Sequence, residues 1–306
     1  MLDLRRLRLL SELSRRGTIA EVARVVGYTP SAISQSLAQL EREVGVVLLE
    51  RDGRRVRLTP AARGLVARTD QVLDELDAAE AELAAEHQAI RGEIVIGAFP
   101  SAAAGLAVPA ALELSREHPD VSCTVLEHEP EDGIPLLRSG ELDLLVSESY
   151  EGVAPAPAGG LESHPLLKEP LWLALPRGDG APEPVALGTL ADAPWIAGLA
   201  GTQFAAALDQ ACRSAGFAPR IVHRADDALL LQALVGSGLG IALLPALACS
   251  GSENVRFVRV TPAPPQREIS ALVRRGAARR PTLGTTLSVL RRCASLTGEA
   301  QLIVGH

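Results

Sequence analysis

The sequence predicts an α/β protein built from an N-terminal winged helix-turn-helix, a long linker helix and a two-lobed α/β body. Three patterns carry this prediction. Residues 18–59 contain two short helical patterns and then an arginine-rich hairpin. Residues 60–90 repeat apolar positions at spacings of four and three. From Gly92 onward, strand and helix patterns alternate, which is typical of an α/β sheet. A chain of 306 residues with 47% hydrophobic content can form two or three compact units.

The N-terminal unit contains signals for three helices. Residues 3–16 place leucines at helical spacing behind an aspartate cap. Thr18 and Glu21 form a capping-box signature for a second helix, which a glycine ends. Thr29 followed by Pro30 then starts a third helix, because it combines an N-cap with a first-turn proline. The apolar residues of the last two helices have the spacing of a helix-turn-helix.

The third helix has a polar outer face at its N-terminal end. Glutamine can pair with adenine through two hydrogen bonds, serine and threonine can bond to several bases, and a helix N-terminus favours a phosphate. The alternative is an ordinary solvated helix face. The candidate DNA-binding residues on this face are Thr29, Pro30, Ser31, Ser34 and Gln35.

The hairpin that follows favours the DNA-binding alternative. Asp52 and Gly53 form a two-residue turn signal between two short strand patterns. Arginines are crowded on both sides of this turn, and their planar, permanently charged groups suit phosphate or a narrow minor groove. The candidate wing contacts are Arg51, Arg54 and Arg55.

The net charge of -7 is distributed unevenly. Residues 1–63 hold twelve arginines against seven acidic residues, whereas residues 64–90 hold one arginine against seven acidic residues. The basic patch is therefore confined to the helix-turn-helix. An acidic remainder would limit nonspecific adhesion to nucleic acid.

The long helix is expected to start at Pro60 and to run to about Ile90. Its apolar seam has the heptad pattern of a short coiled coil. A single exposed helix of this length would be poorly stabilised, so a second copy of the chain is the expected partner. The alternative is a helix that packs on its own chain. The seam positions are Leu65, Thr69, Val72, Leu76, Ala79, Leu83, Glu86 and Ile90.

The body is expected to contain two α/β lobes that the chain crosses twice. The first block predicts strands at 93–99, 121–127 and 142–146 and helices at 101–117 and 130–139. Residues 154–160 are expected to be a flexible connection to the second block. That block and the return predict strands near 161–165, 171–175, 195–196, 220–223, 241–244 and 268–274, with helices at 203–215, 226–235 and 282–296. Ligands of such sheets bind in the cleft outside the carboxyl ends of strands.

Several classes of protein receive little support. Residues 228–252 lack charge over a length that could span a membrane, but glycines and Pro245 divide them into a short helix, a turn and a buried strand. Arginines interrupt the first apolar residues, so we expect no signal peptide and a cytoplasmic protein. The four cysteines lie far apart without metal or redox spacing, and common hydrolase, metalloprotease and phosphate-loop motifs are missing from the sequence.

Four segments together resemble the LysR-type transcriptional regulators over essentially the whole chain: TPSAISQSLAQLEREVGVVLLERDGRRVRLTPA, GEIVIGAFPS, SGELDLLVSE and LVGSGLGIALLP. The resemblance implies a periplasmic-binding-protein-like effector domain and no cofactor. It also implies a homodimer or homotetramer that binds double-stranded promoter DNA, senses a small molecule between the lobes and contacts RNA polymerase. The implied domains are 1–59 for DNA binding, 60–90 for dimerisation, 91–161 with 267–306 for lobe I, and 162–266 for lobe II.

The resemblance also suggests which residues meet the effector. Free amides at a helix N-terminus favour an anion, and polar residues follow several predicted strands or open predicted helices. Plain helix capping is the alternative for the serine and threonine, and a surface ion pair is the alternative for the arginine. Glu148 near the cleft argues against a strongly anionic effector. The candidate effector-binding residues are Pro100, Ser101, Ser147, Thr202, Gln203 and Arg224.

Other functions remain as alternatives. The first is an enzyme with an α/β catalytic body and an accessory DNA-binding domain, although the sequence shows no convergent nucleophile, base and metal set. The second is an architectural DNA binder, which would leave the large body without a purpose. Redox sensing would depend on Cys212 and the distant Cys249 in the second lobe, and it has the weakest support.

Overall fold

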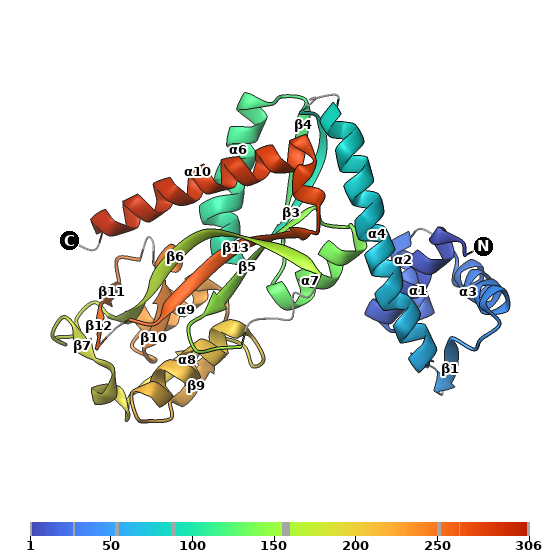
Figure 1. The fold of residues 1–306 in the computed structure, drawn as a ribbon. Coiled ribbons are helices and arrows are strands. Elements are labelled where there is room, and N and C mark those ends of the chain that lie inside the picture. The colour runs from blue at the N-terminus through green and yellow to red at the C-terminus, as the bar shows by residue number, and fades with distance from the viewer. Residues whose placement is uncertain are drawn as a thin grey trace.

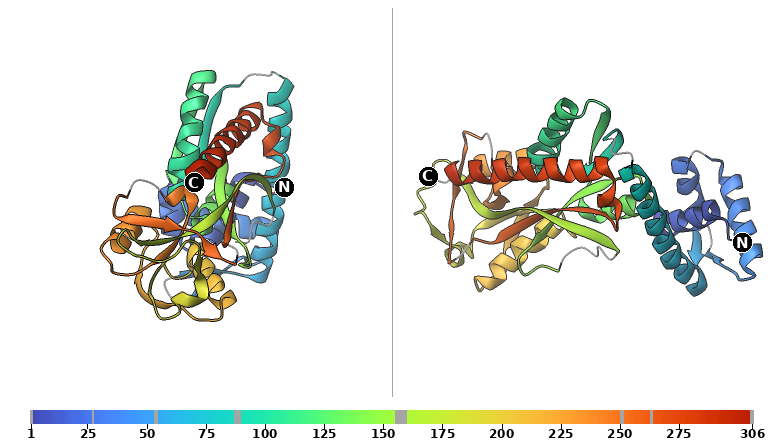
Figure 2. Two further views of the ribbon diagram at one scale, coloured as in Figure 1. Left: turned by 90° about the vertical axis from the view of Figure 1, so that its left-hand side faces the viewer. Right: turned by 45° about the horizontal axis from the view of Figure 1, so that its top comes forward.

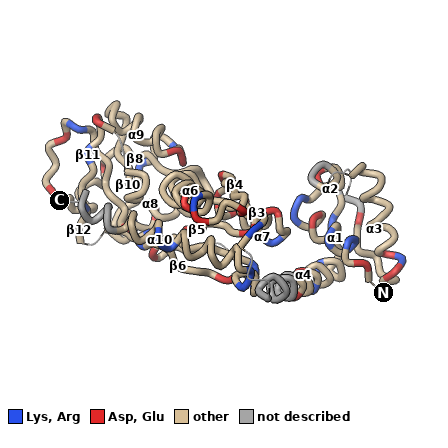
Figure 3. The backbone as a smooth tube through the Cα atoms, turned by 90° about the horizontal axis from the view of Figure 1, so that it is seen from above, with Lys and Arg blue, Asp and Glu red and all other residues tan. Residues whose placement is uncertain are grey.

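The protein is described here by a computed structural model that covers residues 2–26, 28–52, 55–86, 90–154, 160–249, 252–262 and 264–304. A small helical domain lies at one end, a long helix follows, and the α/β body lies beyond it (Figure 1). The same order of parts is visible from above in Figure 3. The predicted fold class is confirmed.

The N-terminal domain contains α1 (Leu4–Arg16), α2 (Ile19–Val26) and α3 (Pro30–Val44). Each of the three expected starts is present, since Asp3, Thr18 and Thr29 accept backbone amides of the helices that they precede. Gly45, with a φ of 67°, ends α3 in the left-handed conformation that glycine adopts without strain. The shared core of the three helices includes Leu10, Leu13, Val22, Ile33, Leu37 and Leu40.

The wing is a hairpin of β1 (Leu49–Asp52) and β2 (Arg55–Leu58). Asp52 at the end of β1 is paired with Arg55 at the start of β2. Of the expected two-residue turn, Asp52 belongs to β1, and Gly53 lies outside the described residues. Glu41 of α3 accepts the amides of Leu48 and Leu49 at 2.8 and 3.0 Å, which ties the wing to α3.

The apolar seam of the helix α4 (Pro60–Glu86) is exposed only in part. Thr69 and Leu73 are buried, and α4 lies against α1 of the same chain, as the alternative interpretation expects. Val72 and Leu76 are 47% and 39% exposed. Packing on the same chain therefore buries the first part of the apolar seam. The side chains of Val72 and Leu76 are exposed and could contact a second copy of the chain. The side chains of seam residues 79, 83 and 86 lie outside the described residues.

Lobe I contains β3 (Gly92–Ala98), α5 (Pro100–Ala102), a π-helical turn (Ala103–Ala107), α6 (Val108–Glu117), β4 (Val121–Glu127), α7 (Pro130–Ser139) and β5 (Leu144–Tyr150). The chain returns to it through β13 (Gln266–Arg274), a 3-10 turn (Ala277–Arg279) and α10 (Pro281–Val304). The helices α6 and α10 cover one face of the sheet, and α7 covers the other (Figure 2). The strands β3, β4 and β5 are parallel, as the α/β pattern predicts.

Lobe II contains β7 (Val185–Ala186), a 3-10 turn (Leu187–Leu190), β8 (Pro194–Ala197), α8 (Gln203–Ser214), β9 (Arg220–Arg224) and α9 (Ala228–Gly236). It continues through β10 (Ala242–Pro245), a 3-10 turn (Ala246–Ala248), β11 (Val255–Val258) and β12 (Val260–Thr261). Within the uncharged stretch, the described residues 228–249 contain α9, a turn, β10 and a short 3-10 turn, so the expected short helix, turn and buried strand are present. Among the described helices, none is long and apolar enough to cross a membrane.

One strand, β6 (Leu161–Pro176), replaces the two short strands expected at 161–165 and 171–175. Its first part pairs with β13 and its last part with β10 and β11, so β6 itself passes from one lobe to the other. Pro165 lies at a register shift opposite Ser270, and a shift of this kind accommodates a residue that cannot donate a backbone hydrogen bond. Along β6, pairing with β13 ends at Pro170, and pairing with β10 begins at Leu171. The expected division of the lobes at residue 162 stays a prediction.

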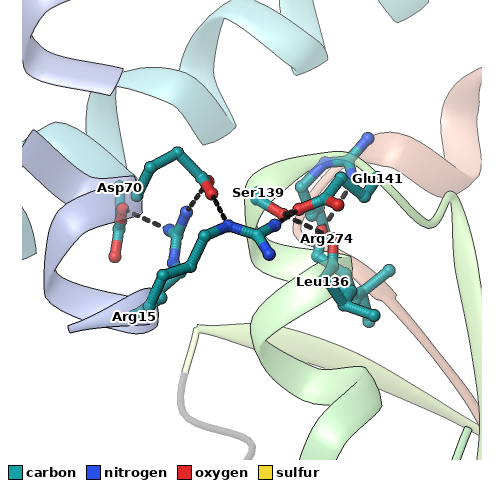
Figure 4. A network of polar contacts seen from close by, with 9 residues as sticks. Arg15, Asp70, Leu136, Ser139, Glu141 and Arg274 are labelled. Carbon is teal, nitrogen blue, oxygen red and sulfur yellow. Dashed lines mark hydrogen bonds and ion pairs between the residues drawn. The ribbon is translucent and has the colours of Figure 1, made fainter. Parts of the chain in front are cut away.

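The N-terminal domain contacts lobe I where α1 meets the turn after α7 (Figure 4). Arg16 donates to Glu141 and, at 2.7 Å, to Glu12. Arg15 donates to Asp70 of α4 at 2.9 Å. On the lobe side, Arg274 donates to the backbone carbonyls that precede and follow the turn, which fixes Glu141 in place.

We expect the contact between Arg16 and Glu141 to contribute roughly 0.5 to 1 kcal/mol, because it is a partly exposed ion pair. A double-mutant cycle with Arg16→Gln and Glu141→Gln, measured by urea unfolding of the full chain, should give this coupling. A control cycle with Arg16→Gln and Glu93→Gln, at an exposed position, should give no coupling energy. Equal results from the two cycles would contradict the interdomain contact.

Candidate functional site

The start of α3 presents polar side chains to solvent. Ile33, Leu37 and Leu40 point into the core, so the opposite face turns outward. The Thr29 hydroxyl accepts the Ala32 amide at 3.2 Å and is therefore occupied as a helix cap. The predicted residues that share this exposed face are Thr29, Pro30, Ser31, Ser34 and Gln35.

Tyr28 is an exposed residue of this face that sequence reasoning missed. It immediately precedes the cap of α3, and its side chain is 60% exposed. A phenol offers both a donor and an acceptor beside the helix N-terminus. A polar aromatic residue directly before a recognition-helix cap is the sequence signal that could have identified it.

The side chains of the predicted wing residues Arg51, Arg54 and Arg55 lie outside the described residues. The described part of the hairpin includes Arg57, which is exposed on β2. Arg57 therefore lies on the strand that pairs with β1, and β1 is itself tied to α3 by the Leu49 amide.

A second candidate site lies between the lobes. It is a cavity of about 40 Å³ that opens to solvent. Lobe I provides the end of β3, the start of α7 and the end of β5, while lobe II provides α8, α9 and the end of β10. The lining residues are Phe99, Pro100, Ser101, Glu129, Glu148, Tyr150, Thr202, Phe204, Asp226, Ala228, Leu231, Leu244, Pro245, Ala248 and Arg267.

Arg267 is the central charged group of this cleft and was missed by sequence reasoning. It is 2% exposed, and its guanidinium donates to Glu148 at 2.9 Å and to Glu169 at 2.8 Å. The Tyr150 hydroxyl donates to Glu148 at 3.0 Å, and Glu169 accepts the Leu247 amide at 2.7 Å. The available signal was an arginine directly before the predicted strand 268–274, where the chain crosses between the lobes for the second time.

Three of the six predicted effector residues line the cleft: Pro100, Ser101 and Thr202. Ser101 accepts a hydrogen bond from Arg267 at 3.2 Å, so it is tied to the central charged group. Thr202 accepts the Ala205 amide at 3.2 Å and donates to the Leu199 carbonyl. It therefore caps α8 and lines the cleft at the same time.

The other three predicted residues do not belong to the cleft lining. Ser147 is buried within β5 opposite Ser270. Gln203 donates to the Ala154 carbonyl at 3.1 Å, and Arg224 donates to the Gly198 carbonyl at 2.8 Å. Position beside a helix start or a strand end did not decide which way each side chain points.

The carboxyl group of Glu129 has a perturbed acidity. Burial, followed by the nearby Glu148 and Asp226 carboxylates, raises the pKa of Glu129 to about 7. Burial also raises the pKa of Glu148, whereas Arg267 opposes this rise. Burial and neighbouring carboxylates thus both raise the pKa of Glu129, which lines the cleft just before α7.

The cysteines of lobe II are weakly acidic. Burial raises the pKa of Cys212 to about 12, and burial also raises the pKa of Cys249. Since the thiolate is the reactive form, both thiols are poor nucleophiles near neutral pH.

Comparisons with known proteins cover both parts of the chain. Residues 4–63 match the family described as bacterial regulatory helix-turn-helix protein, lysR family, and residues 87–294 match the LysR substrate binding domain. A probable hydrogen peroxide-inducible genes activator from Streptomyces viridosporus is 30% identical, with 90% of this chain and 89% of that protein covered. An uncharacterized HTH-type transcriptional regulator, YfeR, from Shigella flexneri is 28% identical, covering 85% and 84% of the two chains. Full-length OxyR from Pseudomonas aeruginosa, solved as a variant, has a similar fold, with a TM-score of 0.71, 23% identity and coverage of 97% and 95%.

The raised pKa of Glu129 predicts a stability that depends on pH. Between about pH 5 and pH 7 the folded protein retains a proton that the unfolded chain has lost, so the free energy of unfolding falls as pH rises through this window. Glu129→Gln should remove this loss and be more stable than the wild type by about 1 kcal/mol at about pH 8, after discounting for solvent screening. At about pH 5 the two should be similar.

Urea unfolding of both proteins at the two pH values tests this expectation. Glu93→Gln, at an exposed position on β3, is the matched control and should follow the wild type. A pH dependence that is unchanged in Glu129→Gln would contradict it.

Proposed function

The chain belongs to the LysR family of transcriptional regulators, and we propose that the start of α3 reads its DNA site while the cleft around Arg267 binds its effector. It is an effector-responsive, DNA-binding regulator that acts as a homo-oligomer. The observation that supports the first assignment is the exposed polar face of α3, with Ser34 and Gln35 turned away from the core. The second assignment is supported by the interlobe cavity.

The DNA-binding assignment divides the residues by role. Ser31, Ser34 and Gln35 would contact base edges, because their side chains carry donors and acceptors suited to the major groove. The wing arginines, including Arg57, would contact phosphate or the minor groove and add affinity without base specificity. Thr29 would chiefly hold the helix start, since its hydroxyl is occupied.

We propose that two copies pair through α4. Val72 and Leu76 lie four residues apart on the same helix face and are exposed in a single chain. Their burial against a second α4 would fix the distance between two recognition helices. Such spacing would match two half-sites of a partly palindromic promoter.

The helix α7 offers a route from the effector to the DNA-binding domain. Glu129, which lines the cleft, directly precedes α7, and Glu141, which contacts Arg16, follows it. A ligand that moves Glu129 would shift a rigid ten-residue helix and so change the contact with α1. Differential binding of the ligand to the two arrangements would supply the energy.

We further propose that the body has no catalytic role. The curated relatives named above are regulators or gene activators, and the buried charged groups of the cleft bond to one another. We also propose that the protein works in the cytoplasm, where it reaches promoter DNA, and that it contacts RNA polymerase there.

The DNA assignment predicts that Gln35→Ala weakens binding to the protein's own upstream region roughly 5-fold to 100-fold, because a base-specific contact is lost. Binding to unrelated DNA should change little. Arg57→Ala should instead weaken both and make the salt dependence shallower. Footprinting and titration at two salt concentrations measure these effects.

Gln210→Ala, on α8 of lobe II, is the matched control and should protect DNA like the wild type. If Gln35→Ala and Gln210→Ala gave the same protection, the recognition face would be wrongly assigned.

Redox sensing has a separate test, because some relatives carry names that refer to hydrogen peroxide. With the pKa of Cys212 raised to about 12, its thiol stays protonated. We therefore expect Cys212→Ser and wild-type strains to show the same promoter response to peroxide. A response found in the wild type but lost in the variant would refute this expectation.

A further inference from the structure

We propose that the effector of this protein is an organic cation, with an ammonium or guanidinium group held between Glu129 of lobe I and Asp226 of lobe II. This inference rests on the proposed role of the cleft as the effector site. It adds the charge and the general shape of the ligand, which the family match does not provide.

The charge of the cleft supports this assignment first. Three carboxylates line the cavity, from Glu129, Glu148 and Asp226, and Arg267 is the single cationic residue among the lining residues. The cavity wall therefore carries more negative than positive groups.

The positive charge of Arg267 is already matched within the protein. Its guanidinium donates to Glu148, to the fully buried Glu169 and to Ser101. Two carboxylates thus face one guanidinium, and the cluster has a net negative charge. An anionic ligand would have to approach this cluster and compete with contacts that are already made.

Glu129 and Asp226 are different, because neither faces a cationic side chain in the described part of the structure. The structure shows no side-chain hydrogen bond or ion pair of Glu129 within the residues that it describes. Asp226 accepts the Leu199 amide at 2.8 Å through one oxygen. Each of these carboxylates comes from a different lobe, and their mutual repulsion contributes to the raised pKa of Glu129.

A cation between the two carboxylates would remove this repulsion. Charge-assisted hydrogen bonds from one ammonium or guanidinium group could reach oxygens of both lobes. The ligand would then draw the lobes together, since each lobe holds one end of the interaction. In its absence the carboxylates oppose closure.

Two hydroxyls at the helix starts of the cleft are engaged within the protein. Ser101 accepts a hydrogen bond from Arg267 at 3.2 Å, and the Thr202 hydroxyl accepts the Ala205 amide at 3.2 Å. Both polar groups that the sequence pattern suggested for a ligand therefore already take part in contacts of the protein itself.

The remaining wall fits an apolar ligand body. Phe204, Leu231 and Leu244 line it on the side of lobe II, and Phe99 lines it on the side of lobe I. Pockets commonly combine such an apolar wall with a few charged groups that orient the ligand. An amine or guanidine on a short aliphatic or aromatic chain has this combination.

Thermal unfolding of the full-length protein with three probes of equal chain length tests the inference. The probes are n-pentylamine, which is protonated at neutral pH, pentanoate and 1-pentanol, each at millimolar concentration and equal ionic strength. We expect only n-pentylamine to raise the melting temperature in a saturable way. Glu129→Gln and Asp226→Asn should each weaken its apparent affinity roughly 10-fold to 100-fold.

Asp226→Asn keeps an oxygen that can accept the Leu199 amide, so its fold should persist. Glu93→Gln is the matched control and should keep the wild-type response. A larger shift with pentanoate or 1-pentanol would overturn the cationic assignment but retain the cleft as the effector site. Full affinity for n-pentylamine in Glu129→Gln and Asp226→Asn would also overturn it.

No shift with any probe would overturn both the cationic assignment and the proposed effector role of the cleft. The DNA-binding role is measured separately by footprinting, so its success or failure is distinguishable from either result.

Discussion

The buried guanidinium of Arg267 is the interaction on which the body depends. It joins β13 to β5 through Glu148 and to β6 through Glu169, and Glu169 in turn holds the Leu247 amide after β10. These elements meet where the chain passes between the lobes. Removal of one partner would leave a buried charge without compensation, at a cost of about 3 to 5 kcal/mol. The base of the cleft, which we call its floor, is therefore the polar cluster of Arg267, Glu148 and Glu169. Helices form much of the outer wall.

The walls differ from the floor in how they are held. Glu148 and Glu169 are matched by Arg267, whereas Glu129 and Asp226 face the cavity without a cation from the described residues. Arg267 thus offsets the charges of Glu148 and Glu169, whereas the repulsion between Glu129 and Asp226 is not offset by a cation from the described residues. We propose that this site responds to a ligand that supplies the missing charge. It also places the responsive carboxylate directly before α7, whose far end lies beside the contact of Arg16 with Glu141.

The N-terminal domain is built on shorter-range interactions. Caps such as Asp3 and Thr29 act within three residues, and Glu41 reaches the wing only seven and eight residues away. Within the described residues, this domain is joined to the body by α4 and by the contact of α1 with α7, which includes Arg16 and Glu141. The position of the domain therefore depends on a long helix and on a few side chains at one edge.

The sequence alone determined the three-helix unit, the wing, the long helix and most strands and helices of the body, but it did not predict β7, β11 and β12. Those features depend on local signals such as caps, glycines and apolar spacing, which act over a few residues. Only the tertiary structure decided that β6 is continuous, that Arg267 is buried, and that Ser101 and Thr202 face the cleft while Ser147, Gln203 and Arg224 do not. Ser101 and Arg267 are separated by 166 positions, so their contact depends on how whole strands are ordered in the sheet. No local pattern specifies that order, because it results from the packing of both lobes around one shared strand.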